Sequence, residues 1–143
     1  MAESYGQCDE AQAKKLSTVI EKAIAATSEI QDFKGGRPKE KGGWKYIVDP
    51  FTGKADLSST AWQLMFLRSA KNAGFDVPKE NIDQAMAFVK HCFNKDTGAF
   101  VYEPYYQITE SRAMAGVGIV AMAHGGLHRS CLLYTSPSPR DRG

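Results

Sequence analysis

Two patterns of apolar residues alternate along the chain and limit the folds that it can adopt. About residues 10 to 30 and about residues 78 to 93 carry apolar side chains on one stripe at helical spacing, with most charged residues off the stripe. About residues 58 to 73 and 110 to 124 are instead apolar almost all round, as in "AWQLMFL" and "AMAGVGIVAMA". A short helix that is apolar on every side must be covered by protein. We therefore expect an all-α fold in which an outer layer of amphipathic helices alternates with an inner layer of buried ones.

The same order of motifs occurs twice. "GGWKY" at 42–46 recurs as "GAFVY" at 98–102, "SSTAW" at 58–62 as "ESRAM" at 110–114, and "IEKAIA" at 20–25 as "IDQAMA" at 82–87. Gly74 and Gly126 follow the two apolar helices at the same offset that separates "SSTAW" from "ESRAM". A period of about fifty to sixty residues predicts a helical-repeat protein whose units bury one another. About two units are present.

These motifs together resemble the prenyltransferase/squalene-oxidase repeat, with "DLSSTAWQLMFLRSAKNAGFDVP" and "SRAMAGVGIVAMA" as the longest stretches. The likeness is greatest to large bacterial repeat proteins of this group, although the Gln of the cyclases' QW motif is missing from both loops. The resemblance implies the α/α toroid of squalene–hopene cyclases and protein prenyltransferases. An open α-solenoid is the alternative, because two units do not show whether a ring closes. We expect residues 1–130 to be part of such a domain, packed against further repeats of its own chain.

The glycine–aromatic loops are the expected joints between the two layers. Glycine permits a tight reversal of the chain, and an aromatic side chain buries a large area. The resemblance implies that the aromatic residue packs at the start of an inner helix. Packing is therefore the expected role of the aromatic residues, with substrate contact as the alternative. The residues of these loops are Gly42, Gly43, Trp44 and Tyr46 in the first unit and Gly98, Phe100 and Tyr102 in the second.

The start of the first apolar helix is a candidate catalytic position. Squalene–hopene-type cyclases protonate an alkene with an Asp of a DxDDTA motif, and the matching stretch here is "DLSSTA" from Asp56 to Ala61. Ser58 takes the place of the proton donor and Ser59 that of the next acid, and a serine hydroxyl cannot protonate an alkene. Asp56, Ser58 or Ser59 can instead cap the helix. Glu110 falls where Ser58 does in the first unit, and we expect it to stabilise the helix dipole.

The sequence gives little support for a metal site, a cofactor, a membrane span or nucleic-acid binding. Zinc chemistry of the protein-prenyltransferase kind needs an Asp, a Cys and a His at one metal. His91 and Cys92 are adjacent on a helix and point in different directions, and His124 and His128 flank an expected helix end. We predict no metal and no cofactor, and we expect Cys92 to be a buried thiol. No apolar run reaches the ~20 residues of a membrane span, and no basic stripe indicates nucleic acid.

Two functions stay open. The favoured one is a non-catalytic scaffold or binding module whose concave interior holds an apolar small molecule or a polypeptide. The alternative is part of a terpenoid cyclase whose catalytic acid lies in repeats outside this sequence. Trp62 and Phe66 are then candidates to line a cavity that stabilises carbocations by cation–π attraction. On a helix that is apolar all round, however, packing in the core is the default expectation for both.

The last thirteen residues, "CLLYTSPSPRDRG", break the helical pattern without a transition. They resemble the translated sequence of an adapter used to build sequencing libraries. We therefore expect residues 131–143 to be a tail that does not belong to the domain. "ESYG" near the start resembles the end of a preceding inner helix, so we also expect Met1 to be an internal start.

Overall fold

The computed structural model describes residues 8–31, 38–46, 54–105 and 111–126. This part of the chain is mostly helical. Its long helices are α1 (Glu10–Gln31), α2 (Leu57–Asn72), α3 (Lys79–His91) and α4 (Arg112–His124), and all four lie close to the ranges that the sequence predicts. The shorter elements, which the sequence patterns did not predict, are the 3₁₀ helix η2 (Pro38–Glu40) and the antiparallel strands β1 (Phe93–Asn94) and β2 (Ala99–Phe100).

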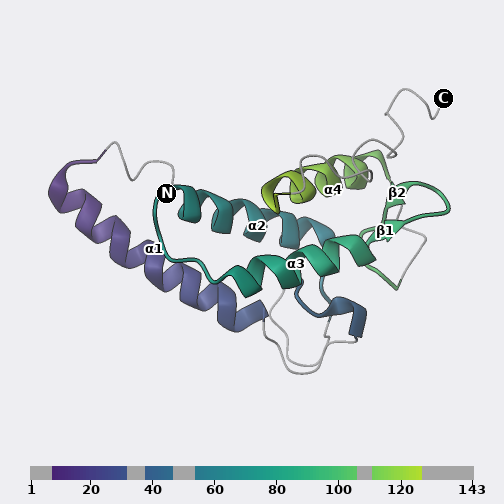
Figure 1. The fold of residues 1–143 in the computed structure, drawn as a ribbon, viewed down its shortest axis with the longest axis horizontal. Helices are drawn as coiled ribbons and strands as arrows, with labels where there is room; N and C mark the ends of the chain where they lie inside the picture. The colour runs from purple at the N-terminus through teal and green to yellow at the C-terminus, as the bar shows by residue number, and fades with distance from the viewer. Residues whose placement is uncertain (1–7, 32–37, 47–53, 106–110, 127–143) are drawn as a thin grey trace.

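The helices form two antiparallel pairs (Figure 1). Helices α1 and α3 run in one direction, and α2 and α4 run in the other. Helices α2 and α4 lie side by side, α3 packs against both, and α1 lies against α2. The direction of the chain therefore reverses at every loop, and the two helices that are apolar all round are neighbours.

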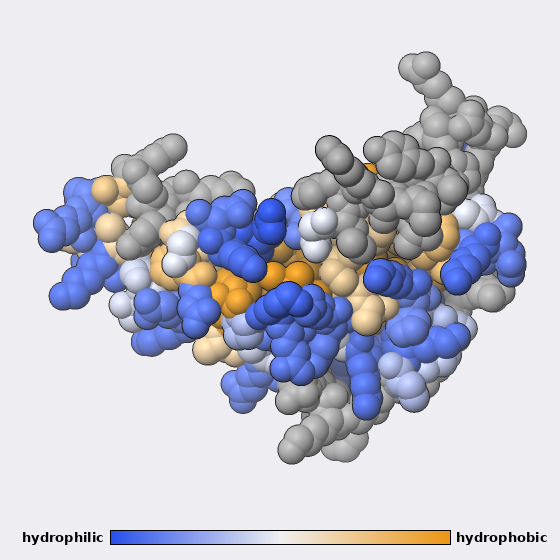
Figure 2. Space-filling model, viewed as in Figure 1, coloured by the Kyte–Doolittle hydropathy of each residue, from blue (hydrophilic) through white to orange (hydrophobic). Residues whose placement is uncertain are grey.

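The core lies where these helices meet. Leu64 and Leu67 of α2, Phe88 and Val89 of α3 and Met122 of α4 are almost completely buried. The expected stripes on the amphipathic helices are largely confirmed, since Ile20, Ile24 and Thr27 of α1 and Ala85, Met86 and Val89 of α3 are buried. On the face shown in Figure 2, hydrophilic side chains surround an apolar band along the middle of the molecule.

Within the described residues, α2 and α4 are not covered on every side, and their cover by further repeats of the chain stays a prediction. Trp62 of α2 is 68% exposed, and Ile119 and Val120 of α4 are 39% and 45% exposed. The two helices pack against each other and against α3, but no described element covers their remaining face. Core packing, the default expectation for Trp62, is therefore not its role here.

Glycines that match in sequence also match in conformation. Gly42 and Gly98 have φ values of 85° and 65°, and Gly74 and Gly126 have values of 91° and 88°. These four are the described residues with positive φ, a region that glycine enters at little cost. The tight reversals before and after each apolar helix are thus built in the same way in both units.

Trp44 joins the first loop to two helices. Its side chain is 1% exposed, and its indole N–H donates to the carbonyl of Thr27 on α1 at 2.9 Å. Its backbone N–H donates to Oγ1 of Thr60 on α2 at 3.0 Å, and its carbonyl accepts from the N–H of Asp56, also at 3.0 Å. The packing role expected for Trp44 is confirmed.

Phe100 has a similar position in the second loop. It is fully buried and meets the ring of Phe93 edge-on, with the two ring centroids 5.1 Å apart. The same ring lies so close to Gly118 of α4 that a Cβ there would overlap it. Packing is thus confirmed for Phe100. It is wrong for Tyr46, which is 85% exposed among the described residues.

Among the described residues, no helix is both long and apolar enough to span a lipid bilayer.

Gly42 and Gly74 offer a matched test of how tightly the loop packs. Gly42→Ala should lower the free energy of unfolding by about 3 kcal/mol, since a Cβ would add a clash with the carbonyl of Gln84 to the strain of positive φ. Gly74→Ala should cost only about 1–2 kcal/mol, because nothing lies within 4 Å of its Cβ and only the strain remains. Urea unfolding followed by circular dichroism measures both, and equal losses would contradict the close approach of Gly42 to α3.

Candidate functional site

Asp56 is the N-cap of α2. Its backbone is extended, with φ −123° and ψ 154°, and its Oδ1 accepts from the N–H of Ser59 at 2.7 Å. The hydroxyl of Ser58 donates to Oδ1 at 2.6 Å, and that of Ser59 donates to Oδ2 at 2.8 Å. The capping role is therefore confirmed and belongs to Asp56. The two serines, which were equal candidates in the sequence, support the cap by donating to it.

The cap is buried within the loop. Asp56 is 4% exposed, and a buried carboxyl group needs hydrogen-bond donors to replace water. One backbone N–H and two hydroxyls supply them here. The carbonyl of Asp56 also accepts from the N–H of Thr60 at 3.1 Å and from its Oγ1 at 2.8 Å. The whole "DLSST" segment is thus fixed before the first turn of α2 is complete.

The second loop contacts the start of α2. The N–H of Leu57 donates to the carbonyl of Tyr102 at 2.9 Å. Burial raises the pKa of the Tyr102 phenol, and the nearby charges of Asp56 and Glu103 raise it further, while a hydrogen bond with Ser58 opposes them. The structure therefore brings Tyr102, which the sequence suggested only as a loop residue, next to the candidate catalytic position.

Two further groups lie near Asp56. Cys92 is completely buried, as the sequence predicts, and burial raises the pKa of its thiol far above the ordinary value, with smaller effects from Asp56 and Glu103. Oε2 of Glu103 is buried and has no hydrogen-bond partner in the described part of the chain. Sequence reasoning missed Glu103, because the residue after the matching tyrosine in the first loop is Ile47 and no repeated acid marks the position.

An apolar groove runs between α2 and α4 and begins next to the cap. The groove has a volume of about 410 Å³. Ser58, at the start of α2, is the lining residue that carries a hydroxyl group. A Cβ at Gly116 would meet nothing within 4 Å, so this glycine opens the α4 side. The residues of this α2–α4 groove are Ser58, Ala61, Trp62 and Met65 of α2 and Ala113, Gly116, Val117 and Val120 of α4.

The two aromatic residues proposed for a cavity have different surroundings. Trp62 lines the α2–α4 groove, whereas Phe66 is partly buried against the core and is not among the lining residues. Glu110 lies outside the described residues, as does the expected tail at 131–143. His91 is exposed while the adjacent Cys92 is buried. In the described ranges, no three His, Cys, Asp or Glu side chains are grouped so that they could hold a metal ion.

Comparison of the chain with protein-family models, with curated proteins and with solved structures found no match. The family resemblance therefore rests on the repeated residues themselves.

Asp56 should contribute more to stability than an ordinary helix cap. Asp56→Ala removes three hydrogen bonds and leaves their donors close to a buried site, so unfolding should become easier by about 2–3 kcal/mol. Ser111→Ala removes one 3.2 Å bond at the exposed N-cap of α4 and should cost about 0.5–1 kcal/mol. If denaturant melts give equal losses for the two variants, the serine hydroxyls add nothing to the cap.

Cys92 should resist alkylation in the folded protein and destabilise it at high pH. Because its pKa is raised on folding, the stabilisation is intact below the ordinary thiol pKa of about 8.5 and declines as pH rises above it. In a Cys8→Ser, Cys131→Ser background, iodoacetamide should modify Cys92 only as fast as the protein opens. Unfolding free energies at pH 8 and pH 10 should fall more steeply than in the same background with Cys92→Ala. Rapid alkylation at pH 8 would show that the thiol is accessible.

Proposed function

We propose that the chain is a segment of a prenyltransferase/squalene-cyclase-like α/α toroid that acts as a non-catalytic binding module. In this arrangement α1 and α3 belong to the outer ring, and α2 and α4 belong to the inner ring. Three observations support it: the reversal of direction at every loop, the side-by-side placement of the two most apolar helices, and the matching glycines at Gly42 and Gly98 and at Gly74 and Gly126. An open solenoid of the same units remains the structural alternative.

The observation that carries the binding role is the α2–α4 groove. Its lining is apolar apart from Ser58, and Trp62 and Val120 are 68% and 45% exposed at its sides. An exposed apolar hollow of this kind is typical of a binding site, because covering it recovers about 25 cal/mol for each Å² of apolar surface. The expected partner is an apolar small molecule or an apolar polypeptide segment on the concave side.

The absence of catalysis is proposed from the residues at the end of the groove. The position that matches the cyclase acid is Ser58, and its hydroxyl donates to Asp56. Asp56 itself accepts from three donors that hold it as a helix cap. Protonation of an alkene at this site would therefore need an acid other than Asp56.

The alternative function, part of a terpenoid cyclase, is favoured by one observation. Trp62 lies on the groove rather than in the core, and an indole face is the best aromatic partner for a cation. An acid in another repeat of the same protein would then start the reaction. This alternative uses the same groove, and the two functions differ only in whether a product is formed.

A neutral fluorescent probe, N-phenyl-1-naphthylamine, tests the binding site. We expect saturable binding that quenches Trp62, and Gly116→Leu should weaken it about tenfold by filling the groove. Lys71→Leu, which adds a leucine to the exposed part of α2 outside the groove, is the matched control and should bind as the wild type does. Equal binding by all three proteins would contradict the groove as the site.

Incubation with squalene separates the two functions. Wild type and Ser58→Asp should both yield no cyclised product by gas chromatography, because one carboxyl group does not replace a complete acid site. Product from the wild type would overturn the non-catalytic role and establish the cyclase alternative. Product from Ser58→Asp alone would show that the groove is a competent pocket that lacks only its acid.

A further inference from the structure

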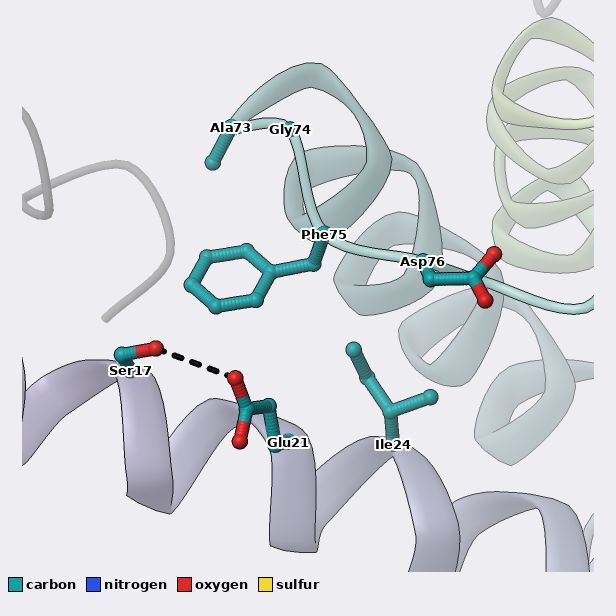
Figure 3. A pocket seen from close by; sticks show the side chains of 7 residues that line it. All are labelled: Ser17, Glu21, Ile24, Ala73, Gly74, Phe75 and Asp76. Carbon is teal, nitrogen blue, oxygen red and sulfur yellow. Dashed lines mark hydrogen bonds between the residues drawn. The ribbon is translucent and has the colours of Figure 1, made fainter.

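A second pocket lies between α1 and the turn that joins α2 to α3, and it shares no residue with the α2–α4 groove. Its volume is about 430 Å³. Figure 3 shows the ring of Phe75 above α1, with the carboxyl group of Glu21 on the opposite side and Asp76 further along the turn. The residues of this α1–turn pocket are Ser17, Glu21 and Ile24 of α1 and Ala73, Gly74, Phe75 and Asp76 of the turn.

The pocket carries two carboxyl groups without a basic partner in the described part of the chain. Glu21 accepts a hydrogen bond from the hydroxyl of Ser17 at 3.1 Å. Asp76 lines the turn side. Between them, Ile24 and Phe75 supply apolar surface. The pocket therefore combines negative charge with an aromatic ring, which is the combination that attracts organic cations.

The second unit shows what binds the equivalent carboxyl group there. The match of "IEKAIA" with "IDQAMA" pairs Glu21 with Asp83, and three residues before the match it pairs Ser17 with Lys79. Nζ of Lys79 lies 2.6 Å from Oδ2 of Asp83. The second unit thus supplies its own cation from the preceding turn of the helix. In the first unit, Ser17 occupies the position of Lys79. The carboxyl group of Glu21 can therefore pair with a cation that the helix itself does not supply.

In the second unit, the helix and the turn pack together where the first unit has its pocket. Ile24 matches Met86, and Ala73 matches Gly125. Met86 packs so closely on Gly125 that a Cβ at this glycine would overlap its sulfur atom. The helix and the turn therefore close on each other in the second unit. In the first unit, Ile24 and Ala73 occupy these two positions, and both line the α1–turn pocket.

From these two differences we propose that the α1–turn pocket binds an organic cation, a guanidinium or alkylammonium group on an apolar stem. The cation pairs with Glu21 as Lys79 pairs with Asp83, and the stem lies against Ile24 and Phe75. Asp76 lies further along the turn, on the other side of Ile24 from Glu21 in Figure 3. A free amine and the side chain of an arginine or lysine in a polypeptide share this chemistry. The site is independent of the groove proposed above.

Titration of the ¹⁵N-labelled full chain with butylguanidinium tests the site. Amide signals of Ser17, Gly74 and Phe75 should shift saturably, and Glu21→Gln should weaken binding about threefold or more. Ser17→Lys is the most specific variant, because it places a lysine where the second unit has Lys79. This lysine should form an ion pair with Glu21 and so abolish the saturable shift. Asp83→Asn is the matched control, because it removes an exposed carboxyl group that already has a partner, and it should leave binding unchanged.

A second titration, with the peptide acetyl-Gly-Arg-Gly-amide, distinguishes the sources of the cation. Tighter binding of the peptide than of butylguanidinium supports a polypeptide ligand, and equal or weaker binding supports a free amine. The proposal is overturned if no saturable shift occurs at the pocket, if Ser17→Lys binds as the wild type does, or if Asp83→Asn weakens binding as much as Glu21→Gln. Gly116→Leu should have no effect here, so failure of this site and failure of the groove are separate results.

Discussion

The burial of the Trp44 indole is the contact on which the arrangement of the first unit depends. Its N–H bonds to α1, its backbone bonds to the start of α2, and its ring fills the space between them. A buried indole contributes several kcal/mol through area alone, provided that its N–H has a partner. The same residue forms a backbone bridge with Asp56, so Trp44 connects the packing of the two helices with the residue that caps α2.

The candidate site is shared between the two units for the same reason. Asp56, Ser58 and Ser59 come from the first unit, while Tyr102 and Glu103 come from the second loop and Cys92 from the end of α3. The N–H of Leu57 donates to the Tyr102 carbonyl, so the second unit supplies an acceptor for the first turn of α2. Neither unit alone builds this end of the groove.

Local features were predicted well from the sequence because their causes are local. The helices follow from apolar spacing, the cap at Asp56 from its place before an apolar run, and the tight reversals from glycines that recur in both units. Exposure was predicted poorly, because it depends on which elements lie nearby. The same apolar pattern buries Leu64 and leaves Trp62 at the surface, and the same loop motif buries Trp44 and leaves Tyr46 outside. Strands of two residues and the unrepeated acid at Glu103 leave no periodic signal at all.

The two units differ in how firmly their helices are held, although they share one plan. Helix α3 packs against α2, α4, β1 and η2. Helix α1 packs against α2, and hydrogen bonds join it to Trp44 in the first loop and to Asn81 at the start of α3. Val19 and Ile30 of α1 remain 45% and 39% exposed. Backbone amides along α1 should therefore exchange with solvent faster than those of α3.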